Sequence, residues 1–122
     1  MEKKVILIVE DDPTVGESLR HLLKKKGHEI LLASNGKEAL QLFRHEVVDL
    51  VITDVVMPEM NGRDLAERMQ AFYPGMKILF MSGHSDETLA HYGVLEPDVA
   101  FLPKPFGPLV LANKVREVLD ES

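Results

Sequence analysis

The sequence of 122 residues lacks several features, and each absence excludes a class of protein. It contains no cysteine, which excludes disulfides, thiolate metal sites and cysteine nucleophiles, and which fits a reducing compartment such as the cytoplasm. No apolar run approaches the roughly 18 residues that span a bilayer. The run Val5–Val9 is too short for the apolar core of a signal peptide. We therefore expect a cytoplasmic segment that makes no contact with a membrane.

An excess of basic residues is also missing. The 14 Lys and Arg side chains are outnumbered by 20 Asp and Glu side chains, which leaves a net charge of −6. Proteins that bind nucleic acid directly use Lys and Arg to replace the counterions of the phosphates. The balance here argues against a nucleic-acid partner, and the run Lys24–Lys26 is interpreted as a complement to a helix C-terminus.

Short apolar runs alternate with amphipathic segments along the whole chain. Five strands are predicted, at 4–9, 28–33, within 47–54, at 76–81 and at 99–102. Helices are predicted after each of them, at 13–27, 35–45, 61–72, irregularly within 84–97, and from 108 onward. This (βα)5 alternation predicts an α/β fold with a doubly wound, five-stranded parallel sheet of order 2-1-3-4-5. We expect one domain over residues 1–122 and no attached output domain.

Three finer expectations concern single side chains. Phe72 is predicted to extend the apolar face that Leu65 and Met69 begin on the third helix. Leu95 is predicted to share the face of the short fourth helix. The five histidines, including His28, are scattered along the chain and are predicted to be exposed.

Polar side chains follow four of the predicted strands. Glu10 and Asp11 follow the first strand, Asp54 ends the third, and Ser82 and Lys104 follow the fourth and fifth. Because the carboxyl ends of parallel strands meet at one edge of a sheet, we expect these groups to lie together. Taken alone, Asp54 is equally well explained as the cap of the next helix.

Carboxylates brought this close repel one another unless a cation lies between them. Oxygen ligands without His or Cys favour a hard ion, so the acidic residues predict a Mg²⁺ site, with Mn²⁺ as a substitute. Lys104 adds a fixed positive charge and Ser82 a hydroxyl donor. A carboxylate nucleophile with these neighbours suits the formation of an acyl phosphate.

Over its whole length the chain resembles the receiver (CheY-like) domain of two-component and phosphorelay systems, which has the flavodoxin-like fold. The resemblance is carried by the segments Val5–Asp12, Thr53–Gly62, Met81–Gly83 and Lys104–Phe106.

The resemblance implies a role for each matching position. Asp54 corresponds to the phosphoacceptor, which takes a phosphoryl group from the phosphohistidine of a sensor histidine kinase or of a histidine phosphotransfer protein. Glu10, Asp11 and Asp54, with the backbone carbonyl of Val56, correspond to the Mg²⁺ ligands. Asp12 falls outside this set and is predicted to cap the first helix.

Further roles follow from the same resemblance. Ser82 and Lys104 correspond to the groups that bind the phosphoryl oxygens, and the Lys104-Pro105 peptide bond is expected to be cis. Ser82 and Phe101 correspond to the switch pair that alters the surface of the fourth helix, fifth strand and fifth helix. Val56 and His84 stand where they would tune dephosphorylation.

Some alternatives remain. The segments around Gly83–Ser85 and from Gly93 to Phe106 resemble receivers at the C-termini of hybrid sensor histidine kinases, although a stand-alone regulator is also compatible with the sequence. The only catalysis expected is the domain's own phosphotransfer and dephosphorylation. A degenerate receiver that acts as an unphosphorylated interaction module is the main alternative. An aspartyl-phosphate phosphatase is disfavoured because Val56 occupies the place of its second Asp, and the acidic run after the first strand disfavours a flavodoxin-like cofactor binder.

Overall fold

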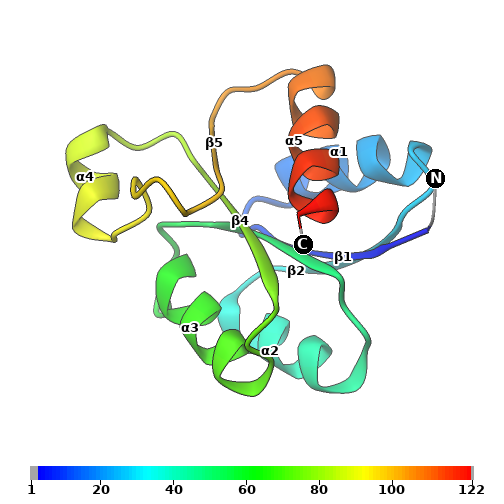
Figure 1. Cartoon of the computed structure of the whole chain (residues 1–122), viewed down its shortest axis with the longest axis horizontal. Coiled ribbons are helices and arrows are strands. Elements are labelled where there is room, and N and C mark those ends of the chain that lie inside the picture. The colour runs from blue at the N-terminus through cyan, green and yellow to red at the C-terminus, as the bar shows by residue number, and fades with distance from the viewer. Residues whose placement is uncertain (1–2, 122) are drawn as a thin grey trace.

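The structure is a computed structural model that describes residues 3–121, in which five strands alternate with five helices (Figure 1). In chain order they are β1 (Val5–Val9), α1 (Pro13–Lys25), β2 (Glu29–Ala33), α2 (Gly36–His45), β3 (Leu50–Asp54), α3 (Gly62–Phe72), β4 (Lys77–Ser82), α4 (Asp86–His91), β5 (Phe101–Pro103) and α5 (Pro108–Asp120). None of the helices in the described part of the chain is both long and apolar enough to cross a bilayer.

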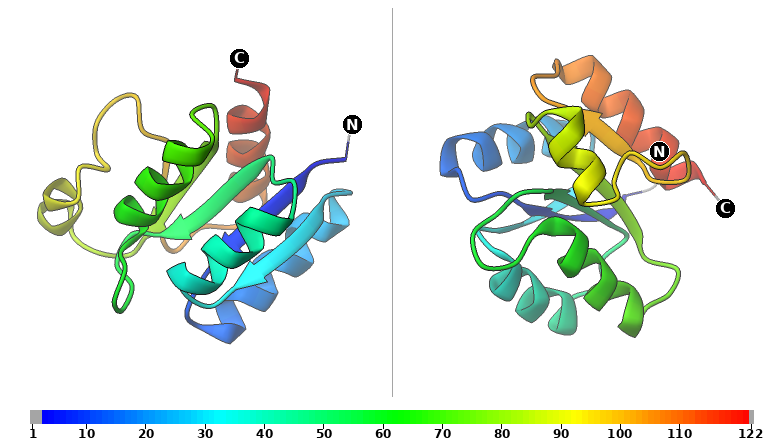
Figure 2. Two further views of the ribbon diagram at one scale, coloured as in Figure 1. Left: turned by 90° about the horizontal axis from the view of Figure 1, so that it is seen from below. Right: turned by 90° about the vertical axis from the view of Figure 1, so that its left-hand side faces the viewer.

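The strands form one sheet in the order β2-β1-β3-β4-β5, and every neighbouring pair is parallel. Helices α1 and α5 cover one face of the sheet, while α2 and α3 cover the other (Figures 1 and 2). The predicted doubly wound α/β fold is therefore confirmed. Because β1 and β3 are adjacent while their following helices lie on opposite faces, a crevice opens at their carboxyl ends.

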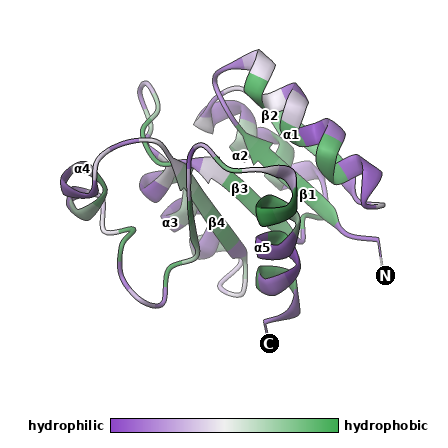
Figure 3. Cartoon of the chain, turned by 90° about the horizontal axis from the view of Figure 1, so that it is seen from above, coloured by the Kyte–Doolittle hydropathy of each residue, from purple (hydrophilic) through white to green (hydrophobic). Residues whose placement is uncertain are grey.

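The core follows from the alternation of side chains along each strand. In β1, Ile6 and Ile8 pack toward α1 and α5, and Leu7 and Val9 pack toward α2 and α3; all four are fully buried. A strand that is covered on both faces must be apolar throughout, and Figure 3 shows the central strands as the most hydrophobic part of the chain. This rigid sheet fixes the positions of the polar residues at its carboxyl edge.

Four helices begin at a residue whose side chain accepts a hydrogen bond from a backbone N–H of the first turn. These residues are Asp12, Asn35, Asn61 and Ser85. The predicted cap at Asp12 is thus confirmed. At α2 the returning bond differs from the usual capping box, because the Glu38 carboxylate accepts from the backbone N–H of Ser34 at 3.2 Å.

Two of the finer expectations about apolar side chains are wrong. Phe72 is 67% exposed, since it is the last residue of α3 and its ring lies 5.7 Å from the guanidinium of Arg44 instead of in the core. Leu95 is 43% exposed, because α4 ends at His91 and Gly93 then adopts a φ of 71°, which takes the following residues off the helical face. The apolar side chains of the third helix that reach the core are Leu65, Ala66 and Met69.

The prediction that all five histidines are exposed is wrong for His28. This residue is 6% exposed at the start of β2, and its Nδ1 atom is buried without a hydrogen-bond partner. Burial, together with the nearby charge of Lys4, lowers the pKa of the His28 imidazole, because both disfavour the protonated ring. The burial of this imidazole therefore lowers the stability of the folded chain, because its Nδ1 atom loses hydration without gaining a hydrogen bond.

The pH dependence of stability should reveal this histidine. Because its pKa is lower in the folded chain, the unfolded chain binds more protons in mildly acidic solution. The stability that depends on a neutral His28 is thus complete above the ordinary pKa of about 6.5 and declines as the pH falls toward the folded value. Urea denaturation at pH 7.5 and 5.5 should show a smaller decline for His28→Leu than for the natural protein.

The same substitution should raise stability at pH 7.5 by about 1 kcal/mol, because it removes a buried polar atom that has no partner. His21→Gln, on the exposed surface of α1, is the matched control and should keep the pH dependence of the natural protein. If His28→Leu kept the pH dependence of the natural protein, the loss of stability at low pH could not be attributed to the buried His28.

Candidate phosphoacceptor site

Four strand ends meet in one cleft at the carboxyl edge of the sheet. Its volume is about 410 Å³, and its lining includes Glu10 after β1, Asp54 at the end of β3, Ser82 at the end of β4 and Lys104 after β5. Backbone hydrogen bonds hold these ends in place, among them one of 2.9 Å from the Lys104 N–H to the Ser82 carbonyl. The fold thus brings together all the strand-end groups that the sequence singled out.

Asp54 is the central carboxylate of this cleft. It is only 6% exposed, since it ends a strand in which every residue is buried. The Lys104 Nζ atom lies 2.7 Å from Asp54 Oδ1 and 3.3 Å from Glu10 Oε2, so one ammonium group donates to two buried carboxylates. Asn61, rather than Asp54, provides the side-chain cap of α3. The interpretation of Asp54 as a helix cap is therefore excluded.

Two opposing effects act on the ionisation of Asp54. Burial raises the pKa of its carboxyl group above the usual range, because the charged form loses hydration. The hydrogen bond and positive charge of Lys104, and to a lesser extent the charge of His84, lower that pKa and partly offset the burial. Lys104 thus favours the ionised carboxylate, which is the nucleophilic form.

Three carboxylates are close enough to share one cation. Glu10, Asp11 and Asp54 each offer an oxygen, and these oxygens all lie within 4.8 Å of one another. A set of oxygens without His or Cys suits Mg²⁺, and Lys104 alone cannot neutralise three negative charges, so the residues present fit such an ion. Asp12 lines the same cleft but accepts a hydrogen bond from the Thr14 N–H at 2.9 Å, which agrees with its predicted role as a cap.

Ser82 and His84 also line the cleft. Ser82 is 4% exposed, and its hydroxyl oxygen accepts a hydrogen bond of 3.0 Å from the backbone N–H of His84. His84 itself is exposed and also lines the cleft. The Ser82 hydroxyl hydrogen has no recorded acceptor among residues 3–121, so it is available to a ligand in the cleft.

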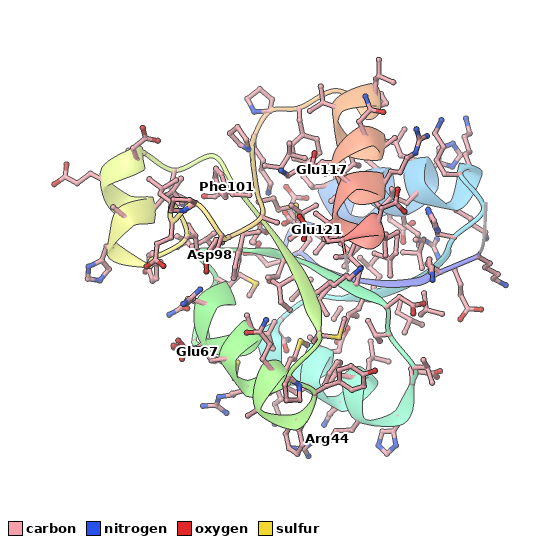
Figure 4. The ribbon with its side chains drawn as sticks, viewed as in Figure 1. Arg44, Glu67, Asp98, Phe101, Glu117 and Glu121 are labelled. Atoms are coloured by element: carbon pink, nitrogen blue, oxygen red, sulfur yellow. The ribbon has the colours of Figure 1, made fainter. Side chains whose placement is uncertain are left out.

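The remaining predicted site residues surround this centre. Val56 lines the cleft and is half-buried, and the Lys104-Pro105 peptide bond is cis. Phe101 is half-buried and packs against an apolar cluster that contains Val55 and Leu89. Figure 4 shows its side chain on β5, between α4 and the rest of the molecule. Phe101 therefore links the residue next to Asp54 with α4 through apolar contacts.

Sequence reasoning missed the importance of Gly62, which it named only as the last residue of the segment Thr53–Gly62. The Gly62 N–H donates to the Val55 carbonyl at 2.7 Å, and a Cβ atom placed on Gly62 would lie 2.1 Å from the Asp54 carbonyl oxygen. No side chain fits at that distance, so the glycine allows α3 to start directly against the end of β3. The pair Asn61-Gly62, a cap followed by a residue without Cβ, was the available signal.

Comparisons with known proteins agree with this geometry. Residues 6–116 match the model of the response regulator receiver domain family. The chain is 35% identical to the sensor kinase CckA of Brucella abortus over 118 residues, which cover 95% of this chain and 12% of CckA. It is 34% identical to the response regulator receiver protein CpdR of the same organism, covering 95% of this chain and 97% of CpdR. The solved receiver domain of the hybrid histidine kinase CckA superposes with a TM-score of 0.79 and 33% identity, covering 95% of this chain and 99% of that domain.

The chain belongs to the response regulator receiver domain family of two-component signalling. It spans nearly the whole of CpdR but only a small part of CckA. The fold is that of CheY-like receivers, as the sequence predicted.

Proposed function

We propose that this receiver takes a phosphoryl group from a phosphohistidine onto Asp54 in a Mg²⁺-dependent reaction. The donor is a sensor histidine kinase or a histidine phosphotransfer protein, and residues 1–122 act as one receiver unit. The observation that carries the proposal is the buried Asp54 carboxylate, which lies 2.7 Å from the Lys104 ammonium inside a cluster of three acids. This complete set argues against the degenerate, unphosphorylated alternative.

In the proposed step, a carboxylate oxygen of Asp54 attacks the phosphorus atom and forms a P–O bond. The P–N bond of the phosphohistidine breaks, and its electron pair returns to the imidazole nitrogen of the donor. Lys104 stays close enough to pair with the phosphoryl oxygens once Asp54 no longer carries a free negative charge. The Ser82 hydroxyl, which lines the same cleft, supplies a second donor.

Glu10, Asp11 and Asp54, with the backbone carbonyl of Val56, would hold the Mg²⁺ ion. Once bound, the ion would offset the charge of the carboxylates and of the incoming phosphoryl oxygens. The chain thus provides acidic oxygens, the Lys104 ammonium and the Ser82 hydroxyl within one cleft.

Phosphorylation would also act as a switch. It adds charge and three acceptor oxygens at Asp54, and the inward movement of Ser82 toward one of them leaves space for Phe101. Phe101 has no hydroxyl group, so its movement changes only apolar packing against α4 and β5. The six-residue α4 is the shortest helix of the described chain, which suits an element that rearranges at low energetic cost.

The test is incorporation of phosphate from acetyl phosphate, followed by intact-protein mass spectrometry. The natural protein should gain one phosphoryl group with Mg²⁺ and none with a chelator present. Asp54→Asn, which preserves the shape of the side chain, should gain none under either condition. The same result is expected whether the receiver is part of a hybrid sensor histidine kinase or a stand-alone regulator, because the phosphoacceptor site is the same in both.

His84 should influence the lifetime of the phosphoryl group. The residue lines the cleft two positions after Ser82, where its ring can limit or orient attacking water. We expect His84→Ala to change the phosphoryl half-life by about threefold or more, a small part of the roughly 100-fold or larger effect of a fully positioned general acid or base. The half-life is measured by the decay of phosphorylated protein after donor removal, with His91→Ala on α4 as the control for loss of an exposed histidine.

A further inference from the structure

A second feature lies away from the phosphoacceptor cleft, between α2 and α3. Two cavities of about 370 and 410 Å³ lie there, and Arg44 lines both of them. Helices α2 and α3 lie side by side on the same face of the sheet (Figures 1 and 2), and Figure 4 places Arg44 on the outer side of this layer. We call the two cavities together the α2–α3 groove. None of the residues that line it lines the phosphoacceptor cleft.

One end of the α2–α3 groove is apolar and exposed. Val47, Phe72 and Tyr73 line it and are 80%, 67% and 63% exposed, and the acids Glu46 and Asp49 line it as well. They account for half of the six large apolar side chains that stand exposed in residues 3–121. A gathering of such side chains in one place, rather than singly over the surface, is typical of a site that another molecule covers.

The other end of the groove is basic. Lys37, Arg44 and Arg68 line it, whereas Glu59 is its only acid, although the chain as a whole carries a charge of −6. Within the described residues, Lys37 and Arg68 have no ion pair or hydrogen bond. Two other arginines on the helices have acidic partners, since Arg20 pairs with Glu17, and Arg63 with Glu67, whereas Arg116 on α5 has none within the described residues. The groove therefore offers two cations that no acid among residues 3–121 neutralises.

The floor of the basic end is apolar and tightly packed. Leu40 and Met60 line it, and Met60 lies so close to α2 that a Cβ atom on Gly36 would be 2.8 Å from its sulfur. The loop that carries Met60 thus packs against the first turn of α2.

We propose that the α2–α3 groove docks an acidic, amphipathic helix of another protein. Its carboxylates would face Lys37, Arg44 and Arg68, and its apolar side chains would cover Val47, Phe72 and Tyr73. The ten residues of α2 are about 15 Å long, a length that three turns of a partner helix match. A helix laid in a groove of this length presents anchors at i, i+3 or i+4, and i+7.

The probe is a pair of synthetic helical peptides of about 16 residues, each with Leu and Phe along one face and three Glu residues at one end. The two peptides carry the Glu residues at opposite ends, so that a helix bound in either direction along the groove can be detected. Binding is followed by amide chemical shifts and by fluorescence anisotropy. We expect one peptide to shift the amides of α2, α3 and the Pro58–Met60 loop, and added salt to weaken its binding.

Substitutions in the groove should separate the contribution of the basic end to binding from that of the apolar end. Arg68→Glu and Phe72→Glu should each weaken binding by about tenfold or more, which corresponds to the loss of a central contact. The matched controls are Arg116→Glu and Leu109→Glu on α5, which make the same changes at exposed positions on the opposite side of the sheet and should leave the affinity unchanged. Melting curves of all four variants verify that each is folded.

Four outcomes of the peptide experiments would overturn the proposal. They are no binding of either peptide at millimolar concentration, shifts confined to other elements, equal loss of affinity in the control variants, and equal binding of a peptide whose Glu residues are replaced by Gln. Binding of a single-stranded oligonucleotide without binding of the peptides would also overturn it, because the groove would then attract polyanions in general. The outcome is independent of Asp54, so it is measured both in the natural protein and in Asp54→Asn.

Discussion

Replacing Gly62 by alanine should impair the phosphoacceptor site more than any other single methyl group added to this chain. The new Cβ atom would lie 2.1 Å from the Asp54 carbonyl oxygen and 3.2 Å from the Val55 Cα atom. Both are backbone atoms that cannot rotate away, so β3 and α3 must separate. We expect a loss of about 2–3 kcal/mol in the free energy of unfolding.

The effect on phosphorylation should be larger than the effect on folding. Displacement of the Asp54 backbone moves its carboxylate away from Lys104, which now lies 2.7 Å from it, and a misplacement of about 1 Å costs on the order of 100-fold in rate. The rate of phosphorylation by acetyl phosphate is measured at a temperature at which the variant is fully folded.

Gly75→Ala is the matched control for this substitution. A Cβ atom on Gly75 would meet only the Tyr73 ring, at 3.7 Å, which is an ordinary contact. Its stability and phosphorylation rate should remain those of the natural protein. If Gly62→Ala proved as stable and as active as this control, the close approach of α3 to the end of β3 would be wrong.

Removal of one acid from the cluster should abolish the response of the protein to Mg²⁺. An ion that binds only the folded chain stabilises it by RT ln(1 + [L]/Kd), which is about 1.4 kcal/mol at a concentration ten times the Kd. We expect this gain in the natural protein and almost none of it in Asp11→Asn at the same concentration, since one of the three clustered carboxylates is lost. Urea denaturation with and without Mg²⁺ measures the difference.

The adjacent residue offers a close control. Asp12 is exposed and lines the same cleft, but it caps α1 and lies outside the cluster of three acids. Asp12→Asn keeps the cap, because Asn caps helices as well as Asp does. Its gain in stability with Mg²⁺ should equal that of the natural protein. An equal loss of the Mg²⁺ response in Asp11→Asn and Asp12→Asn would contradict the assignment of the three clustered acids, because binding would then depend only on the overall negative charge.

Much of the fold could be predicted because its strands are short, apolar and separated by clear helix signals. Where a strand is covered on both faces, as β1 and β3 are, its residues are apolar up to the carboxyl end, and the pattern becomes unambiguous. The prediction failed at the ends of elements. Phe72 has the spacing of a core residue, but it falls on the last turn of α3, where the contact with Arg44 takes the place of core packing.

The candidate site could be predicted because its residues follow directly from the ends of strands, and topology alone brings those ends together. Features that depend on contacts across the fold could not be predicted. The burial of His28 depends on how the folded chain packs around the start of β2. The close approach of Gly62 to Asp54 depends on how sharply the chain turns between β3 and α3. The α2–α3 groove likewise appears only when two helices with separate patterns lie side by side.

The most direct measurement is the transfer of a phosphoryl group from a P–N donor to one residue. Phosphoramidate contains the bond that breaks in a phosphohistidine, and peptide mapping after the reaction locates the group that has received the phosphate. We predict Mg²⁺-dependent phosphorylation of Asp54 alone, as an acyl phosphate that hydroxylamine cleaves, with no product in Asp54→Asn. Phosphate on a histidine, equal labelling of Asp54→Asn, or no labelling of the natural protein in the presence of Mg²⁺ would contradict the account.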